Sequence, residues 1–187
     1  ILDSVRNENN LYEANLKHRN KSPLLDYSYQ EDEKTAYLSV KQAGRGVNWL
    51  NISGRNDWEL NLTRNIPLLI NVNAGAGEFI FNLEELIVQK LTLNSGAGDL
   101  EINLGNSVHN LELNSAAANV KLNIPHDRVF SIHTNGLISN HNFNELGLIK
   151  VGNNLYQTAN FTNSNNKLTI EINSPASNIN LNFYRMD

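Results

Sequence analysis

The sequence lacks cysteine, so disulfide frameworks, cysteine-ligated metal centres and cysteine nucleophiles are excluded. It is also poor in charge: 18% of its residues are charged and the net charge is −4, which argues against a general nucleic-acid binder. No apolar run approaches the roughly 18–20 residues that a membrane helix needs. We therefore expect a globular chain that does not itself span a membrane.

The residue in excess is asparagine, with 34 in a chain of 187 residues. Many of these asparagines fall in a motif that recurs at a nearly constant spacing, and such self-similarity is typical of repeat proteins. The copies read NAGAGEFIFNL at 73–83, NSGAGDLEINL at 94–104, NSAAANVKLNI at 114–124 and NSPASNINLNF at 173–183. An earlier copy is visible at 53–62. The wider interval between the copies that begin at Asn114 and Asn173 corresponds to about three periods across a degenerate stretch.

Each copy has the same internal pattern. A short alternating strand ends at asparagine, a segment of small residues follows, and a second alternating strand comes next, as in LTLN, SGAG and DLEINL at 91–104. Alternation of apolar and polar residues predicts β-strands, and glycine permits the bend between them. We find no convincing amphipathic helix, so we predict an all-β fold.

Aligning the copies gives three rows that stay apolar over five copies. Parallel strands stacked turn upon turn need such rows, because each turn buries its apolar residues against its neighbours. We therefore predict a single-stranded parallel β-solenoid, similar to a β-helix, with about 20–21 residues per turn and the right-handed winding that parallel crossovers favour. The rows are Trp58, Phe79, Leu100, Val120 and Ile179; Leu60, Phe81, Ile102, Leu122 and Leu181; and Leu62, Leu83, Leu104, Ile124 and Phe183.

Asparagine forms two further rows, which we expect to point outward. An amide group both donates and accepts, so asparagines about 4.8 Å apart on parallel strands can bond along the row. The main interpretation is structural; the alternative is a regular polar surface that binds a repetitive polymer such as a glycan. The first row, Asn61, Asn82, Asn103, Asn123 and Asn182, supplies the candidate binding residues Asn61, Asn82, Asn103 and Asn123; the second row is Asn73, Asn94, Asn114 and Asn173.

The N-terminal part differs from the repeats, because residues 1–48 carry more charge and hold four of the 6 tyrosines. Strands are predicted at 11–16, 24–30 and 36–42, as a β meander that caps the first solenoid turn. We assign residues 1–48 to this cap module and residues 49–187 to the solenoid repeats, with a short C-terminal cap at 183–187. The aromatic residues Tyr27, Tyr29, Tyr37 and Trp49 are interpreted as cap core and alternatively as a binding surface for a partner.

At these residues the chain resembles the toast-rack domain family. The resemblance rests on the run from Trp58 through NVNAGAGEFIFNL and LTLNSGAGDLEINL, and upstream on LYEANLKHRNKSPLLDYSYQ and AYLSVKQ, so it covers about residues 11–125. The family is similar to cell-envelope proteins linked to responses to cell-wall-active antibiotics and to proposed adhesins of solenoid type. The resemblance implies a bacterial, envelope-associated, non-enzymatic β protein, and it offers no catalytic residues to carry over.

Three acidic residues, Asp57, Glu78 and Asp99, recur with the period of the repeat. Stacked like charges are destabilising and would favour a cation, and oxygen ligands suit Ca²⁺. The simpler interpretation is that each carboxylate accepts a hydrogen bond from backbone beside its bend, since the next position in the row is Asn119. We therefore expect no cofactor, with a calcium site as the weak alternative.

A catalytic centre is not apparent. Polysaccharide-cleaving β-helix enzymes cluster carboxylates with a basic residue, whereas here the acids form one row and the candidate base, Arg55, lies on a bend. The five histidines form neither HxH nor HExxH, and GAGAG is not followed by the Lys-Ser/Thr of a phosphate loop. We expect surface or corner histidines and no enzymatic activity.

The leading functional hypothesis is a non-enzymatic envelope module that binds, scaffolds or regulates an envelope protein such as a membrane sensor. The second is an adhesin-like or glycan-binding solenoid that recognises a surface polysaccharide, and the third is a polysaccharide-active enzyme. The open strand edges of a solenoid also suggest weak dimerisation through the C-terminal end. The chain begins without methionine, so we expect a trimmed or mature product, periplasmic or surface-exposed, whose full-length form could carry a signal or lipid anchor.

Overall fold

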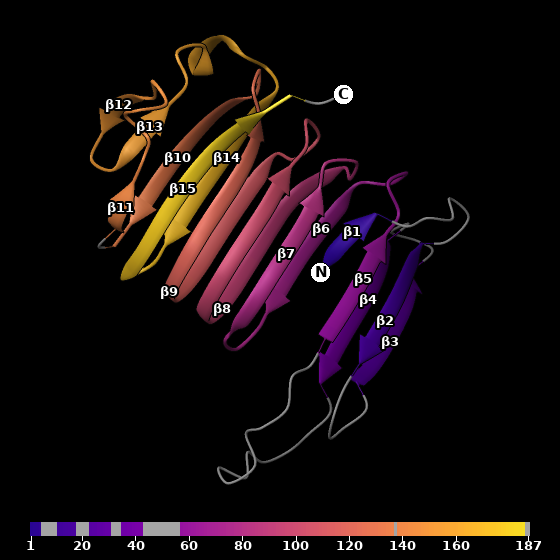
Figure 1. Cartoon of the computed structure of the whole chain (residues 1–187). Coiled ribbons are helices and arrows are strands. Elements are labelled where there is room, and N and C mark those ends of the chain that lie inside the picture. Colours follow the sequence, from indigo (N-terminus) through magenta and orange to yellow (C-terminus); the bar gives the residue numbers. More distant parts are fainter. Residues whose placement is uncertain (5–10, 18–22, 31–34, 43–56, 137, 186–187) are drawn as a thin grey trace, which may run out of the picture. The chain divides into compact units, whose positions relative to one another are not determined.

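The computed structural model describes residues 1–4, 11–17, 23–30, 35–42, 57–136 and 138–185 (Figure 1). Its regular structure consists of strands apart from one 3₁₀ turn, η1 (Phe161–Asn163), which confirms the all-β prediction. The chain divides into two compact parts. One comprises residues 1–13 and 61–187, and the other comprises residues 14–60. The boundary predicted between residues 48 and 49 lies outside the described residues.

The smaller part contains an antiparallel hairpin. Strand β3 (Pro23–Gln30) pairs along its full length with β4 (Thr35–Gln42). Two further strands, β2 (Tyr12–Lys17) and β5 (Asp57–Leu62), straddle the division between the two parts. The strands predicted at 11–16, 24–30 and 36–42 coincide with β2, β3 and β4 to within one residue.

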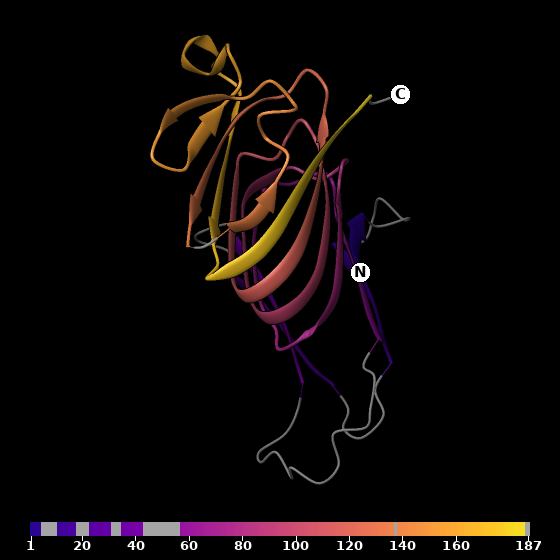
Figure 2. The same ribbon diagram turned by 60° about the vertical axis from the view of Figure 1, so that its left-hand side comes forward.

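The larger part is built on two ladders of mainly parallel strands. The first ladder contains β6 (Leu68–Asn73), the first half of β8 (Val88–Leu104), the first half of β9 (Asn110–Pro125), β14 (Lys167–Asn173) and β10 (Val129–Asn135). The second contains β7 (Gly77–Leu83), the second halves of β8 and β9, β15 (Ala176–Tyr184) and β11 (Ile138–His141). In Figure 2, β8, β9 and β15 are long ribbons that curve strongly along their length.

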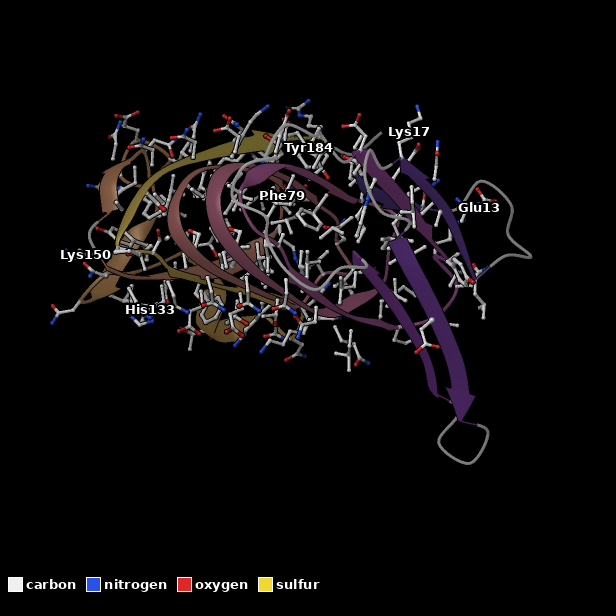
Figure 3. The ribbon with its side chains drawn as sticks, turned by 90° about the horizontal axis from the view of Figure 1, so that it is seen from below. Glu13, Lys17, Phe79, His133, Lys150 and Tyr184 are labelled. Carbon is white, nitrogen blue, oxygen red and sulfur yellow. The ribbon has the colours of Figure 1, made fainter. Side chains whose placement is uncertain are left out.

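The hydrophobic core comes from the inward rows of both ladders. In the first ladder Leu91, Leu111, Ile170 and Ile132 are aligned across four strands and are all buried. In the second ladder the predicted apolar rows are aligned from β7 to β15, as in Phe81, Ile102, Leu122 and Leu181. The side chains drawn in Figure 3 fill the interior of the curved strands. Burial of these rows supplies the main driving force for the fold.

The short strand β1 (Leu2–Ser4) changes the predicted row at the start of the second ladder. It pairs in parallel with β7, and Leu2 stands opposite Phe81. The spacing of the repeat predicted that Leu60, from the copy at 53–62, would stand opposite Phe81. The N-terminal strand takes this position instead, because its buried leucine can complete the same row without belonging to a repeat.

The order of the last repeats also differs from the prediction. The repeat made of β14 and β15, named here the C-terminal repeat, pairs directly with β9 rather than lying three turns beyond it. The preceding segments β10 and β11 lie on its other side. The C-terminal repeat is therefore inserted between two segments that precede it in the chain (Figure 1).

This insertion means that the sheet does not end at residues 183–187 as predicted. Phe183 and Tyr184 pair with Ile124 and Pro125 inside the sheet. The outer end is formed by β10, whose free edge is covered by the antiparallel hairpin of β13 (Leu155–Gln157) and β12 (Ile149–Gly152). The pairing is therefore mixed, and only part of it is parallel.

A buried arginine occupies the connection that crosses the inserted repeat. Arg128 is 4% exposed, and its guanidinium donates a hydrogen bond of 2.5 Å to the carbonyl oxygen of Val108. Its Nε–H has no partner among the described residues, and burial lowers the pKa of the guanidinium from its usual value. The backbone N–H of Arg128 donates to the carbonyl oxygen of Pro125, and the backbone N–H of Val108 donates in the same way to that of Gly105. Arg128 therefore occupies a corner equivalent to the one where the previous turn has the buried residue Val108.

Candidate functional site

The outward side chains of the second ladder form a regular polar surface, which we name the amide face. Its residues stand in three rows, because alternate side chains of parallel, in-register strands line one face. The rows are Glu78, Asp99, Asn119, Asn178 and Asn140; Ile80, Glu101, Lys121, Asn180 and Asn142; and Asn82, Asn103, Asn123 and Asn182.

The third row is a continuous chain of amide hydrogen bonds. Asn103 donates to Asn82 over 2.7 Å, Asn123 donates to Asn103 over 2.5 Å, and Asn182 donates to Asn123 over 3.1 Å. Every donated bond runs in the same direction along the row. Asn103, in the middle of the row, uses one N–H and one oxygen lone pair for its neighbours, so a second N–H and a second lone pair remain for other groups. Asn123 also donates to Glu101.

A groove of about 600 Å³ runs between the first and second rows of the amide face. Its sides carry carboxylates at the β7–β8 end and amides towards β15 and β11. Glu101 pairs with Lys121 at 2.8 Å and also accepts a bond from Asn123 at 3.2 Å. The hydrogen bond from Lys121 is the main cause that lowers the pKa of Glu101 from its ordinary value of 4.5.

The predicted acidic row is only partly assembled. Glu78 and Asp99 are directly opposite on paired strands, whereas Asp57 begins β5 in the smaller part of the chain. Asp99 accepts a hydrogen bond of 2.8 Å from the Asn119 amide, whereas the predicted acceptor role was towards backbone. In the described part of the chain, no three histidine, aspartate or glutamate side chains are grouped so that they could hold a metal ion.

The second predicted asparagine row lies at the bend between the ladders and gains one member. Asn94, Asn114 and Asn173 each donate to the preceding amide over 2.8 Å, and Asn135 donates to Asn173 over 2.8 Å. The sequence did not reveal Asn135, because the inserted repeat separates it from the regular spacing. These bonds stabilise the bend, and a neutral amide-to-amide bond contributes about 1 kcal/mol.

The first ladder carries a second, smaller groove of about 420 Å³ that sequence analysis missed. Its outward residues include Lys90, which pairs with Glu112 at 2.7 Å, and Glu171, which stands opposite His133. Figure 3 labels His133 on this side of the strands. The signal in the sequence was the polar position between the apolar pairs of each copy, as in LELN at 111–114.

One histidine differs from the surface position expected of it. His141 is aligned with Ile179 in an inward row, and its ring stacks on Phe143 with centroids 4.4 Å apart. Its Nδ1 is buried without a partner among the described residues. His109 and His126 are exposed, as expected.

The remaining predicted site residues are less informative. Asn61 is half-buried at the end of β5. Trp49 lies outside the described residues, and for Tyr27, Tyr29 and Tyr37 only the backbone in β3 and β4 is described. The interpretation of these aromatic residues as cap core, and the alternative of a binding surface, therefore both stay predictions.

The fold and the amide face define an all-β repeat protein whose polar side chains form ladders along the sheet. Residues 3–124 match the family model described as the N-terminal domain of toast_rack, DUF2154. The match covers more than half of the chain, so the chain belongs to the toast-rack family.

The fold is also similar to a solved structure. A proposed cell adhesion protein from Clostridium sporogenes ATCC 15579 aligns with a TM-score of 0.83 and 23% identity, over 98% of this chain and 86% of the other. At this identity the likeness shows the fold alone. No curated protein matches the chain.

Proposed function

We propose that this chain is a non-enzymatic binding module of the bacterial cell envelope and that its amide face binds an extended, hydroxyl-rich polymer such as a surface polysaccharide. The observation that carries the proposal is the third row of the amide face, in which the same amide group, with its donor and its acceptor, repeats at each step along the sheet. Hydroxyl groups both donate and accept, so they can pair with the donor and with the acceptor of an amide.

The architecture that we propose behind this surface is the right-handed β-solenoid with the N-terminal strands as its cap. Parallel, in-register pairing between positions one repeat apart supports it in both ladders. A solenoid suits a polymer ligand, because equal steps along the sheet present the same group to successive units of the ligand.

The charges of the groove narrow the class of polymer. Four carboxylates, Glu78, Asp99, Glu101 and Glu145, line it together with the cation Lys121. An acidic polymer such as a uronate chain would meet repulsion there, so the proposal is for a neutral or amine-bearing polysaccharide.

The absence of catalysis is part of the proposal. A glycoside hydrolase needs a carboxylic acid with a raised pKa, whereas hydrogen bonds from Lys121 and Lys90 lower the pKa values of Glu101 and Glu112.

An envelope location is supported by the family and by the adhesion role proposed for the structural neighbour. No helix in the described part of the chain has the length and apolarity to cross a membrane. The alternative of a regulatory protein partner rests on aromatic side chains outside the described set, and native-membrane crosslinking would test it.

The binding proposal is tested with immobilised neutral, amine-bearing and uronate polysaccharides. The variant Asn119→Ala/Asn140→Ala removes two exposed amides from one row of the amide face, and Asn71→Ala removes an exposed amide from the first ladder as a matched control. We expect the wild type and the control to bind a neutral or amine-bearing polymer and the double variant to bind at least about tenfold more weakly, as for two lost hydrogen bonds. Equal binding by all three proteins would overturn the assignment of the amide face.

A further inference from the structure

The position of the C-terminal repeat within the sheet has a consequence for how two copies of the chain can interact. Its strand β14 pairs with β9 on one side and β10 on the other, and β15 pairs with β9 and β11. The repeat thus occupies a slot between two walls that are both built from earlier segments of the chain. Among the described strands β14 and β15 come last in the chain, so none of the others has to be threaded for the repeat to leave the slot.

The two walls of the slot match each other in register. Ser131, Thr169 and Asn110 are aligned across β10, β14 and β9, so residues of β10 stand 21 positions after their counterparts in β9. On the second ladder Asn140, Asn178 and Asn119 are aligned in the same way, again with 21 positions between the outer two. This is the spacing of successive repeats elsewhere, such as Phe81 and Ile102. The repeat therefore lies between two segments whose aligned residues have the spacing of directly successive repeats.

The contacts of the slot are ones that any copy of the chain can supply. Asn173 donates to Asn114 on one wall and accepts from Asn135 on the other, each over 2.8 Å. Ser115 donates to Ser174 over 3.2 Å, and Tyr184 donates to the carbonyl oxygen of Leu104 over 2.6 Å. The inward residues of the repeat are buried against both walls. A second copy would reproduce every one of these contacts.

The segment that connects β13 to the C-terminal repeat can take a different course without loss of a strand pair. Residues 158–166 join β13 to β14, and their regular structure is the short turn η1. Its contacts are of two kinds. Ser164 donates locally to the carbonyl oxygen of Asn166 at 3.2 Å, whereas the backbone N–H of Thr158 donates to the carbonyl oxygen of Phe130 at 3.0 Å and Asn166 donates to that of Asn106 at 3.5 Å. Such a segment can be rearranged without breaking a strand pair.

We propose that the C-terminal repeat, residues 167–184, is exchangeable and that the slot accepts this repeat from a second copy of the chain, giving a reciprocally swapped dimer. The swap preserves the pairing and core contacts and changes only the course of residues 158–166. Exchange of identical elements is a low-cost route to dimers, and high protein concentration favours it. The proposal goes beyond polymer binding, because it concerns strand exchange with a protein partner of known sequence.

A disulfide across the slot tests the proposal, and the absence of native cysteine makes the test clean. The double variant Asn114→Cys/Asn173→Cys places thiols on aligned neighbours in β9 and β14. Within a monomer they close inside one chain, whereas within a swapped dimer they link two chains. The matched control, Asn94→Cys/Asn114→Cys, places thiols on β8 and β9, which remain together in either form.

Both variants are incubated over a range of concentrations, oxidised, and separated on a denaturing gel without reductant. We expect covalent dimer to increase with concentration for the slot variant, by at least about fivefold over the control. If both variants give the same fraction of covalent dimer at every concentration, the proposal is wrong.

The unmodified protein gives a readout that does not depend on cysteine. Samples held at high concentration are diluted and followed by size exclusion with light scattering. A dimer that persists for hours after dilution supports exchange, because separating swapped chains requires the repeat to leave its slot. A dimer that dissociates at once, or a strictly monomeric mass at all concentrations, overturns it.

Discussion

Glycine at position 98 is required by how closely two strands approach at the bend. Gly98 has φ of +153°, and a Cβ atom there would overlap the carbonyl oxygen of Gly77 on the paired strand. We predict that Gly98→Ala lowers the free energy of unfolding by about 1–3 kcal/mol, as strained backbone does. Gly75→Ala is the matched control, because a Cβ there meets no atom within 4 Å, and it should change stability by less than about 1 kcal/mol. Urea unfolding of both variants measures the difference, and equal midpoints would contradict it.

The amide face also gives a residue-scale prediction about pH. The hydrogen bond from Lys121 lowers the pKa of Glu101 below 4.5, so this carboxylate contributes stability above about pH 4.5 that is lost as the pH falls through its folded-state value. The pair is largely exposed, with side-chain exposures of 49% and 38%, so its contribution is below about 1 kcal/mol. Lys121→Met should therefore reduce the difference in unfolding free energy between pH 7 and pH 3.

The control for the pH prediction is Lys150→Met. The Lys150 ammonium lies 5.7 Å from the centroid of the Tyr156 ring and takes part in none of the ion pairs of the described residues. It should leave the pH dependence unchanged. The measurement is urea unfolding of both variants at pH 7 and pH 3. The same pH dependence in Lys121→Met and Lys150→Met would contradict the proposed effect of Lys121 on Glu101.

At the scale of elements, the hairpin of β12 and β13 closes the outer end of the sheet. Tyr156 in β13 is 6% exposed and packs edge-on against Phe143 and His141, with ring centroids 5.1 and 5.4 Å away. We predict that Tyr156→Ala lowers the free energy of unfolding by about 3–5 kcal/mol, because it leaves a cavity beside two rings. Ile149→Ala, at an exposed position of β12, should cost less than about 0.5 kcal/mol. Similar losses of thermal stability in the two variants would show that the hairpin does not seal the core.

The elements also show what the sequence could predict. The apolar and asparagine rows followed from the regular spacing of the repeat, because in-register parallel strands convert equal spacing in sequence into alignment in space. The closing hairpin did not follow, since IKVGNNLYQ at 149–157 is not a copy of the repeat. The place of β1 was equally hidden, because a three-residue strand with one buried leucine has no periodicity to detect.

At the scale of the whole molecule, the order of strands departs from the order of the chain. The interval between the last two clear copies, which begin at Asn114 and Asn173, indicated three further turns, whereas the structure uses one step. Regular spacing indicates which residues are aligned in a row, but it does not indicate the order in which the strands lie across the sheet. Two residues that line the groove of the amide face, Glu78 and Asp99, were singled out from the sequence. The part of the lining that β11 supplies was not, because it depends on the inserted repeat.

Because the C-terminal repeat is inserted into the sheet, the stability of β10 depends on β14, which lies much later in the chain. Ile170 in β14 is 2% exposed and is aligned with Leu111 on one side and Ile132 on the other. Ile170→Ala should lower the free energy of unfolding by about 2–5 kcal/mol. Because β14 is the parallel partner of β10, the loss should reach β10 and β13 although they precede the substitution in the chain.

Hydrogen exchange followed by mass spectrometry distinguishes this arrangement from a sequential stack of repeats. In the Ile170→Ala variant, amides of β10 and β13 should exchange faster by a larger factor than those of β7, because opening of the C-terminal repeat leaves the outer end without its support. Ile102→Ala in β8, at a fully buried position, is the matched control and should speed exchange in β7 more than in β10. The reverse pattern, or a uniform change along the chain in both variants, would mean that β10 does not depend on the inserted repeat. This dependence is expected because, among the described strands, β14 lies between β9 and β10 and pairs with both.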